Sequence, residues 1–454
     1  MEVTPEQWVA WYDSVPENRC PGCGKIIRDR RKHLYICAKD CIPTKPNRCQ
    51  KAAVGTYLKR LNEVVKDEIE KLKKKLQALD RTTREYADST AMLDSLRSVT
   101  LGKPITKDHY MQKDRKKSSD EFIFCSREEA MDILTQGPPL LPIIIPPAPM
   151  TEEDCNLFIR ARNMITAMIA NTKWVDVYDS GKKLHNRIPE KMTGFHAVDR
   201  FYSDDQPSIN ALNNRIYKEG DNHWMGSIPG YGMIRWVVEQ TKGEGVDLTS
   251  FAAALRVWLL ASRGADTHWH VDHNGVTTSI LLWMGSKLWL VSCDPSGKKL
   301  QDFAVTKECP QNPSVILLAE GYELIQPPMT IHSVHTCQRS LAECNMYPDS
   351  RTMPTILKQT RLELEHDHIT NDDHHKDLGQ VLDRLMVEWE IAVKMNQAEA
   401  WPEEEYLGEA KRDELWIEKK MKDSSPHPRA TTGNSQGSKR GPSEPNLRRR
   451  KRRK

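Results

Sequence analysis

The chain has 454 residues and a formal net charge of +4, which is enough for two or three domains. Hydrophobic residues make up 38% and charged residues 29%, a composition typical of a soluble protein with polar stretches outside a packed core. No apolar run approaches the roughly 20 residues of a membrane span. Residues 1–8 also lack the basic and then apolar pattern of a signal peptide, so we expect a protein of the reducing cytosol or nucleus that does not bind a membrane.

The first predicted element is a metal-binding module in residues 1–50. Five of the 11 cysteines lie between Cys20 and Cys49, and this odd count with one tight cluster favours metal binding over a disulfide framework. The spacing C-x2-C-x9-H-x3-C suits tetrahedral zinc, because the first pair forms a turn and the second pair shares one face of a helix. We predict a C2HC-type zinc finger with the ligands Cys20, Cys23, His33 and Cys37, and with Cys41 or Cys49 as alternatives to Cys37.

The basic residues before His33 leave two roles open for this finger. Arg28, Arg30, Arg31 and Lys32 give its helix a basic start that could meet nucleic-acid phosphates. A structural finger, or one that contacts protein, would carry the same charges on a solvated face. Nucleic acid and protein therefore stay alternative partners of this module.

Residues 55–80 are predicted to form an amphipathic helix, and residues 81–119 a linker. The helix prediction rests on apolar residues at helical spacing with charges between them, namely Leu58, Leu61, Val65, Ile69, Leu72, Leu76 and Leu79. A short coiled coil is the alternative, but Glu68 and Lys75 interrupt the heptad seam, so we favour a helix packed on its own chain. Residues 81–119 are polar and are interpreted as a linker.

A folded domain is expected over residues 120–350. Ser126 predicts the N-cap of a short helix, and a second helix is predicted at about 151–171. Between them, the proline-rich residues 138–149 are expected to stay out of a central strand. Between residues 251 and 346, short apolar segments alternate with turns and no helix is expected, which favours a β-sandwich or barrel.

Residues 267–273, with the sequence THWHVDH, carry a possible metal-binding pattern. Side chains at i and i+2 of a strand share a face, so His270 and Asp272 point together. The third ligand must come from elsewhere, and His332 and His335 are the candidates. Two histidines and one carboxylate on one side of an octahedral metal leave three positions open, which suits non-haem Fe(II) oxygen chemistry.

A lysine follows this pattern among apolar residues. Residues 279–292 are interpreted as two strands around a turn at Gly285 and Ser286. Lys287 then stands at a strand start, 17 residues after His270. A buried lysine there needs an anionic partner or loses its hydration at a cost, and an exposed turn lysine is the alternative.

Together, HxD, G-x-K-x-W and P-x-x-x-H resemble the motifs of the JmjC domain of the cupin superfamily in order, spacing and strand context. In this chain they are His270-Val-Asp272, Gly285-Ser-Lys287-Leu-Trp289 and Pro328-Met-Thr-Ile-His332. The resemblance extends over about residues 122–350, half of the chain. It implies a mainly β catalytic core, a double-stranded β-helix or jelly-roll barrel, with flanking helices.

The resemblance also implies roles for individual residues. Iron would be bound by His270, Asp272 and His332. Lys287 and Thr267 would hold the distal carboxylate of 2-oxoglutarate. Asn345 lies where the family often has an asparagine near this co-substrate.

Three other histidines compete for the role of ligand. His332 is preferred over His335 because the family's third ligand follows the proline turn by a few residues, and because the two lie on opposite faces of a regular strand. His268 and His273 are interpreted as residues behind the ligands or as structural residues.

The C-terminal part is predicted to comprise a helical region, residues 357–420, and a disordered basic tail, residues 423–454. The histidines of the helical region lie among acids and are interpreted as surface residues, not metal ligands: His366, His368, His374 and His375. Ten Lys or Arg and two acids give the tail a charge of +8, so the rest of the chain carries −4. The run from Arg448 to Lys454 resembles a nuclear localisation signal and would also bind nucleic acid non-specifically, whereas a tail without an address function is the alternative.

These features favour an Fe(II)- and 2-oxoglutarate-dependent dioxygenase that acts on protein in the nucleus, with Fe2+, 2-oxoglutarate and Zn2+ as cofactors. Histone lysine demethylation and protein hydroxylation are the candidate reactions. The first alternative is a catalytically inactive JmjC-type scaffold held on chromatin by the finger and tail. The second is a cupin activity with another metal and no 2-oxoglutarate, against which Lys287 and Thr267 count.

Overall fold

The computed structural model describes residues 46–112, 118–148, 152–182, 189–214, 223–232, 237, 241, 248–294, 297–371, 374–395 and 401–424. The predicted zinc ligands Cys20, Cys23, His33 and Cys37 and the alternative Cys41 lie outside these residues, whereas the other alternative, Cys49, lies inside them in the helix Pro46–Ala78. Residues 425–454 of the predicted basic tail lie outside them as well.

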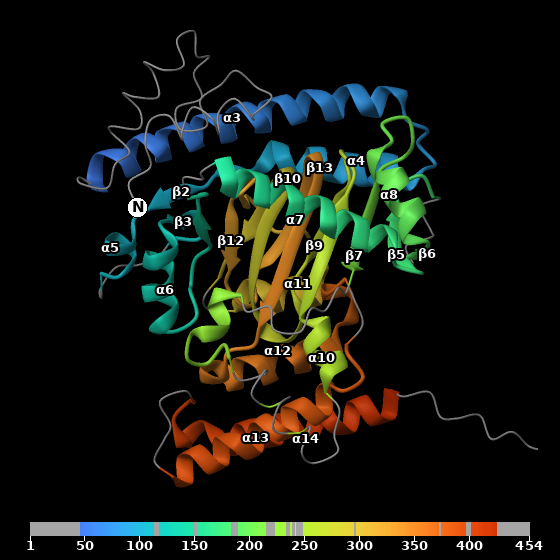
Figure 1. Cartoon of the computed structure of the whole chain (residues 1–454). Helices are drawn as coiled ribbons and strands as arrows, with labels where there is room; N and C mark the ends of the chain where they lie inside the picture. Colours follow the sequence, from blue (N-terminus) through green and yellow to red (C-terminus); the bar gives the residue numbers. More distant parts are fainter. Residues whose placement is uncertain are drawn as a thin grey trace, which may run out of the picture.

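A mixed sheet of 13 strands forms the centre of the described structure (Figure 1). Its main path runs β2 (Lys103–Ile105), β3 (Glu121–Phe124), β4 (Ile143–Ile145), β12 (Glu323–Gln326), β10 (Thr277–Ser292), β13 (Ile331–Tyr347), β8 (Arg256–Ala261), β7 (Ile209–Asn214), β5 (Val175–Asp179) and β6 (Glu190–Met192). Off this path, β11 (Ser314–Ala319) pairs with β10 and with β1 (Thr100–Leu101), and β9 (Asp266–His270) pairs with β13. The β-rich core with flanking helices that we predicted is thereby confirmed.

The two longest strands, β10 and β13, pair antiparallel along the middle of this sheet. We predicted two strands around a turn at Gly285, but β10 is one strand of 16 residues. Its register against β13 shifts on both sides of Gly285, whose φ is +86°. A Cβ there would lie 2.1 Å from the carbonyl oxygen of Arg339. The glycine therefore marks a β-bulge inside a continuous strand rather than a hairpin turn.

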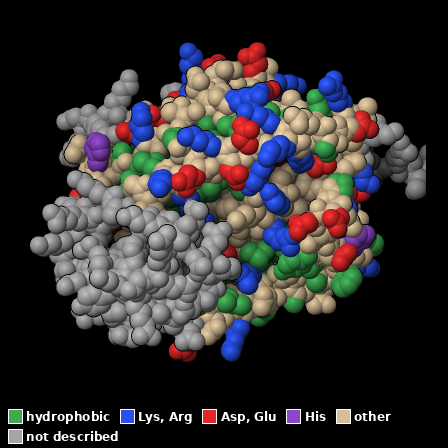
Figure 2. Space-filling view, turned by 90° about the horizontal axis from the view of Figure 1, so that it is seen from above, with side chains coloured by type: hydrophobic (Ala, Val, Ile, Leu, Met, Phe, Trp, Pro, Cys, Tyr) green, Lys and Arg blue, Asp and Glu red, His purple; other side chains and the backbone are tan. Residues whose placement is uncertain are grey.

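The predicted amphipathic helix is present as α3 (Pro46–Ala78), which crosses the top of the molecule in Figure 1. It packs on its own chain through a buried stripe that includes Leu61, Val65 and Leu72. The hydroxyl of Tyr57 donates to the carbonyl oxygen of Leu317 in β11 at 2.9 Å and accepts from the amide of the same residue at 2.8 Å. Figure 2 shows basic and acidic side chains intermingled on this side of the molecule.

Residues 81–119 are not the linker that we predicted. They form α4 (Arg84–Ser98), β1, β2 and α5 (Lys107–Tyr110). Thr83 caps α4, and Met92, Leu93 and Leu96 are buried in the same apolar core as α3. In the sequence these three apolar residues are surrounded by polar ones. The high average polarity of the segment therefore led to the prediction of a linker.

The prediction for the proline-rich segment was also wrong. Its residues 143–145 form β4, which lies between β3 and β12 inside the sheet. All three are isoleucines and retain their amide groups, whereas Pro142 and Pro146 flank the strand. The prolines therefore limit the length of the strand without removing its ladder bonds.

The remaining helices are α6 (Arg127–Thr135), α7 (Glu152–Ala170), α8 (Gly194–Tyr202), α10 (Thr249–Ala254), α11 (Lys298–Thr306), α12 (Met353–Glu365), α13 (Leu378–Lys394) and α14 (Leu407–Ser424). The predicted cap is present, because Ser126 and Glu129 form a capping box at α6. We expected no helix between residues 251 and 346, but α11 lies there and buries Leu300 and Phe303. None of the described helices combines the length and apolarity needed to cross a membrane.

The predicted C-terminal helical region is formed by α12, α13 and α14, which lie beneath the sheet in Figure 1. Its apolar cluster includes Met353, Leu382 and Trp389. The middle of α12 lies close to the loop that follows β9, since Gln359 and Thr360 bond to this loop. This contact brings the C-terminal helices to the site described next.

Candidate metal and co-substrate site

The structure brings together the three side chains that were predicted to bind iron. His270 ends β9, Asp272 precedes the short 3-10 helix η2 (His273–Gly275), and His332 lies in β13 directly opposite His270 in the ladder. One ligand atom from each lies within 4.8 Å of the others. The carboxylate oxygen Oδ1 of Asp272 is 4.0 Å from Nε2 of His270 and 3.8 Å from Nε2 of His332.

Both imidazoles are oriented for binding through Nε2. Nδ1 of His270 lies 2.7 Å from the carbonyl oxygen of His268, and Nδ1 of His332 lies 3.1 Å from that of Thr330. Such carbonyl partners favour a proton on Nδ1 and leave the lone pair of Nε2 for a metal, although Nε2 of Gln326 also lies 3.2 Å from Nδ1 of His332. Burial, together with the neighbouring His332, lowers the pKa of His270 to about 3 against the opposing charge of Asp272. His270 is therefore neutral at physiological pH, as a metal ligand must be.

Two hydrogen bonds fix the carboxylate of Asp272. Its Oδ2 accepts from the Thr278 hydroxyl at 2.5 Å and from Nε2 of Gln326 at 2.9 Å. Gln326 in turn accepts from the indole of Trp289 at 2.9 Å. Oδ1 is left to face the two histidines. Trp289 belongs to the predicted motif, but no signal in the sequence pointed to Gln326 or Thr278.

A pocket adjoins the three ligands and is walled mostly by apolar side chains of β7, β8, β10 and β13. The apolar lining residues are Leu212, Val257, Leu259, Ile280, Trp289, Val334 and Met346. His270, Asp272, His332, Thr267 and Lys287 open into the same pocket. The site therefore combines candidate metal ligands with an apolar pocket wall and one lysine.

Lys287 is buried in this pocket, not exposed at a turn. Its side chain is 3% exposed, and Nζ donates to the Thr336 hydroxyl at 3.3 Å across the β10–β13 ladder. Burial lowers the pKa of Lys287 to about 8. Within the described ranges, no carboxylate lies at ion-pair distance from Nζ. Asp266 lies near enough to favour the charged form, but its carboxylate is paired with His335, so the pocket holds a cation without an ion-pair partner among the described residues.

The two other residues predicted to meet the co-substrate behave differently. Thr267 lines the pocket, and its hydroxyl accepts from Nδ2 of Asn210 at 2.9 Å. Asn345 is placed away from the pocket, where its amide donates to Oε1 of Glu343 at 3.2 Å. Its neighbours in β13, Cys344 and Met346, line the pocket instead. Side chains alternate along a strand, so Asn345 points to the other face, contrary to the role predicted for it.

The rival histidine His335 lies on the opposite face of β13 from His332. Nδ1 of His335 is 2.6 Å from Oδ1 of Asp266, and Nε2 is 3.1 Å from Oε2 of Glu68 in α3. Burial alone would lower the pKa of His335, but these two carboxylates outweigh it and raise the pKa to about 9. His335 is therefore a buried cation that attaches α3 to the sheet.

The other histidines also have partners away from the three ligands. Nε2 of His268 pairs with Oδ1 of Asp88 in α4 at 2.9 Å. His273 lies against Glu363 of α12. We interpreted the histidines of the C-terminal region as surface residues, but His374 and His375 are both largely buried. Nε2 of His374 lies 3.7 Å from Oε2 of Glu363.

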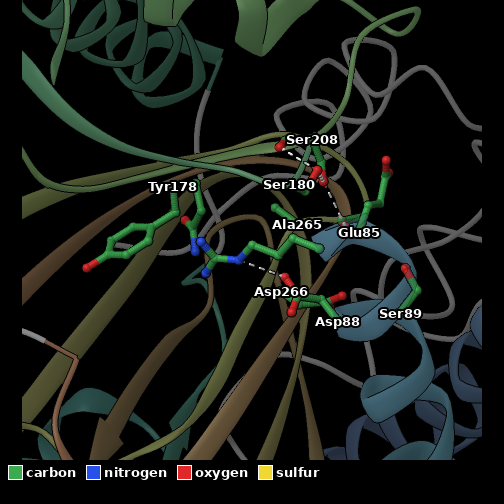
Figure 3. Close-up of a pocket in the computed structure, with 11 residues that line it drawn as sticks. Glu85, Asp88, Ser89, Tyr178, Ser180, Ser208, Ala265 and Asp266 are labelled. Atoms are coloured by element: carbon green, nitrogen blue, oxygen red, sulfur yellow. Dashed lines mark hydrogen bonds and ion pairs between the residues drawn. The ribbon is translucent and has the colours of Figure 1, made fainter. Parts of the chain in front are cut away.

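A second pocket lies between α4 and the sheet (Figure 3). Glu85, Asp88 and Ser89 reach it from α4. The guanidinium of Arg84 pairs with Asp88 at 3.2 Å, and this carboxylate is also the partner of His268. Arg84 and Asp88 thus pair with each other, and Asp88 attaches α4 beside β9 through His268.

No known family model matches this chain, and no curated protein matches it.

Proposed function

We propose that this protein is an Fe(II)- and 2-oxoglutarate-dependent dioxygenase with a core of the JmjC type, in which the strands around β10 and β13 form the barrel. The observation that carries the proposal is the unmatched cation of Lys287 in the pocket of His270, Asp272 and His332. A metal alone explains the three ligands. A metal together with an anionic co-substrate explains the lysine as well.

The residues fit the proposed cofactor. Two neutral imidazoles and one carboxylate on one side of a metal are the ligands of non-haem Fe(II) oxygenases. When bound, iron and 2-oxoglutarate supply the oxidising chemistry for hydroxylation of a C–H bond. Zinc also accepts this ligand set, but zinc would leave the charge of Lys287 unexplained.

The side chains of the pocket would bind the co-substrate and orient the metal ligands. Lys287 would hold the distal carboxylate of 2-oxoglutarate, with the hydroxyls of Thr336 and Thr267 nearby as further donors. Thr278 and Gln326 keep one oxygen of Asp272 away from the metal. The apolar wall excludes water, which strengthens the interaction between lysine and carboxylate.

The proposed substrate is a protein, and the proposed location is the nucleus. The location rests on the basic tail and the finger of the sequence. Histone lysine demethylation and protein hydroxylation differ in their products. Hydroxylation of an N-methyl carbon gives an unstable carbinolamine that releases formaldehyde, whereas hydroxylation of a side-chain carbon leaves a stable alcohol.

Turnover of 2-oxoglutarate to succinate by the Fe(II)-loaded full chain tests this proposal, with formaldehyde assayed alongside on methylated peptides. We expect succinate from the wild type, and at least a tenfold loss in His332→Ala and Lys287→Ala, as is typical when a ligand or a charge-assisted contact is removed. The exposed residues His109 and Lys59 provide the matched controls His109→Ala and Lys59→Ala. Equal turnover in all four variants would show that the reaction does not depend on this pocket, and no succinate from folded and iron-loaded protein would argue for a non-catalytic scaffold.

A further inference from the structure

A second group of metal-binding side chains lies beside the first and involves none of its ligands. It consists of His273 in η2, Glu363 in α12 and His374 just before α13, with one ligand atom of each within 4.8 Å of the others. Oε2 of Glu363 is 3.2 Å from Nδ1 of His273 and 3.7 Å from Nε2 of His374. The two imidazole rings are 4.8 Å apart between centroids.

We propose that His273, Glu363 and His374 bind a second divalent metal ion of the zinc type. Two imidazoles and one carboxylate are a common protein ligand set for zinc, with water in the fourth position. Metal–ligand bonds of about 2.0–2.1 Å in tetrahedral geometry separate ligand atoms by about 3.3 Å. The observed separations of 3.2 and 3.7 Å lie near this value before any adjustment of the side chains.

The carboxylate of Glu363 is held in the orientation that such a ligand requires. Its side chain is fully buried. Oε1 accepts from Nε2 of Gln359 at 2.7 Å, and the amide of Asn274 donates to both oxygens, at 2.9 Å to Oε1 and 3.1 Å to Oε2. Oε2 is the oxygen that both histidines approach. Outer hydrogen bonds that fix the orientation of the side chain are typical of carboxylates that bind metals.

The charge balance also favours a metal over two ion pairs. Protonation of both His273 and His374 would place two positive rings side by side, and like charges at this distance oppose each other. One buried carboxylate would have to compensate both. A single divalent ion replaces the two protons and binds both rings in their neutral form. The side chains of His273 and His374 are 16% and 15% exposed, which leaves an entry for the ion.

The proposed ion would hold the rim of the first pocket. His273 follows Asp272 directly and lines that pocket together with Asn371. Gln359, which donates to Glu363, also donates to the carbonyl oxygen of Asp272 at 2.9 Å. The ion would therefore attach the segment before α13 and the end of α12 to the loop that carries Asp272. This role does not depend on which metal the first site binds.

Zinc binding to the full chain in the His332→Ala background tests the proposal, because this background removes a ligand of the first site. Zinc is measured by elemental analysis after dialysis, alone and with His374→Gln or Glu363→Gln added. We expect each added substitution to lower bound zinc by about one equivalent per chain, since each removes one of three ligands. The neighbouring His375, which packs on Phe251 and lies beside Asp377, provides the matched control His375→Gln.

Two further measurements distinguish loss of the metal site from loss of folding in the variants. Circular dichroism establishes that each variant is folded, and His273→Gln replaces any variant that is not. Cobalt(II) added in place of zinc should give intense visible d–d bands in the His332→Ala background that weaken in His374→Gln, where only the bands of the predicted finger would be left. Unchanged zinc content and cobalt spectra in every folded ligand variant would overturn the proposal and leave a network of ion pairs. Loss of the first site alone would leave this result unaffected.

Discussion

His332 in β13 lies directly opposite His270 in β9, and their imidazole centroids are 4.1 Å apart. The register of this ladder therefore decides which histidine completes the metal site. A slip by three residues would exchange the two faces of β13 and bring His335 opposite His270, toward Asp272. His335 is instead held on the other face by Asp266 and Glu68. The cation on one face of the strand thus helps to keep the metal ligand on the other.

Replacement of Lys287 should separate stability from function. Burial lowers its pKa from 10.5 to about 8, so the folded state bears the full cost of the charge below pH 8. We expect Lys287→Met to stabilise the fold at pH 7 by about 1–3 kcal/mol, at about 1.4 kcal/mol per pKa unit, and to abolish binding of 2-oxoglutarate.

The pH dependence of the free energy of unfolding tests whether burial of the Lys287 charge destabilises the fold. The unfolded chain keeps its proton up to about pH 10.5 and the folded chain loses it at about pH 8, so stability rises with pH in this interval. The advantage of Lys287→Met in urea unfolding should therefore shrink from pH 7 to pH 10. A variant that is less stable than the wild type at pH 7 would show that Lys287 has an anionic partner inside the fold.

His335 should contribute stability with the opposite pH dependence. Its pKa is raised from 6.5 to about 9, so its contribution is fully present below pH 6.5 and is lost as pH rises through 9. We expect His335→Gln to destabilise the protein at pH 6 by about 3–5 kcal/mol, because Glu68 and Asp266 lose their buried cation. The difference from the wild type should narrow by pH 10, as measured by urea unfolding, whereas a constant difference would mean that the imidazole acts as a neutral group.

Gln326 should position the metal ligand without binding the metal. It donates to Asp272 and lies beside Nδ1 of His332. We expect Gln326→Ala to weaken binding of Fe(II) or Co(II) by about 10- to 100-fold, the usual effect of removing an outer partner. Gln338, which is exposed in β13, provides the control Gln338→Ala. Metal titration with equal affinities for both variants would contradict this role.

The bulge in β10 should tolerate glycine only. Gly285→Ala would combine a φ of +86° with a Cβ placed 2.1 Å from a backbone oxygen, and we expect a loss of roughly 2–4 kcal/mol in urea unfolding. Gly55 in α3 has no atom within 4 Å of the corresponding Cβ. Gly55→Ala should instead stabilise the helix by up to about 1 kcal/mol, and equal effects of the two substitutions would refute the bulge argument.

The sequence allowed those parts of the site to be predicted that depend on local spacing. The i, i+2 relation of His270 and Asp272 needs only a strand. The burial of Lys287 follows from its apolar neighbours. Asn345 was assigned to the wrong face of its strand. Side chains alternate between the two faces along the 17 residues of β13, and a motif alone does not give the face on which a residue lies. Gln326 contacts Asp272 across 54 residues of chain, and Glu363 contacts His273 across 90. No local sequence pattern could therefore predict these contacts.

The fold was predictable to a similar degree. The amphipathic pattern of α3 and the capping residues of α6 are local signals, and both elements are present. The order of the 13 strands is a property of long-range pairing. For β1 and β2, with two and three residues, strand formation depends on the neighbouring strands more than on their own side chains.

Anaerobic titration of the Fe(II)-loaded protein with 2-oxoglutarate tests the central claim most directly, because the chelate has a weak visible charge-transfer band. We predict a saturable band in the wild type that is weakened or shifted in Lys287→Ala and in His332→Ala, and is unchanged in Lys59→Ala. Absence of the band from folded and iron-loaded wild-type protein would contradict the account.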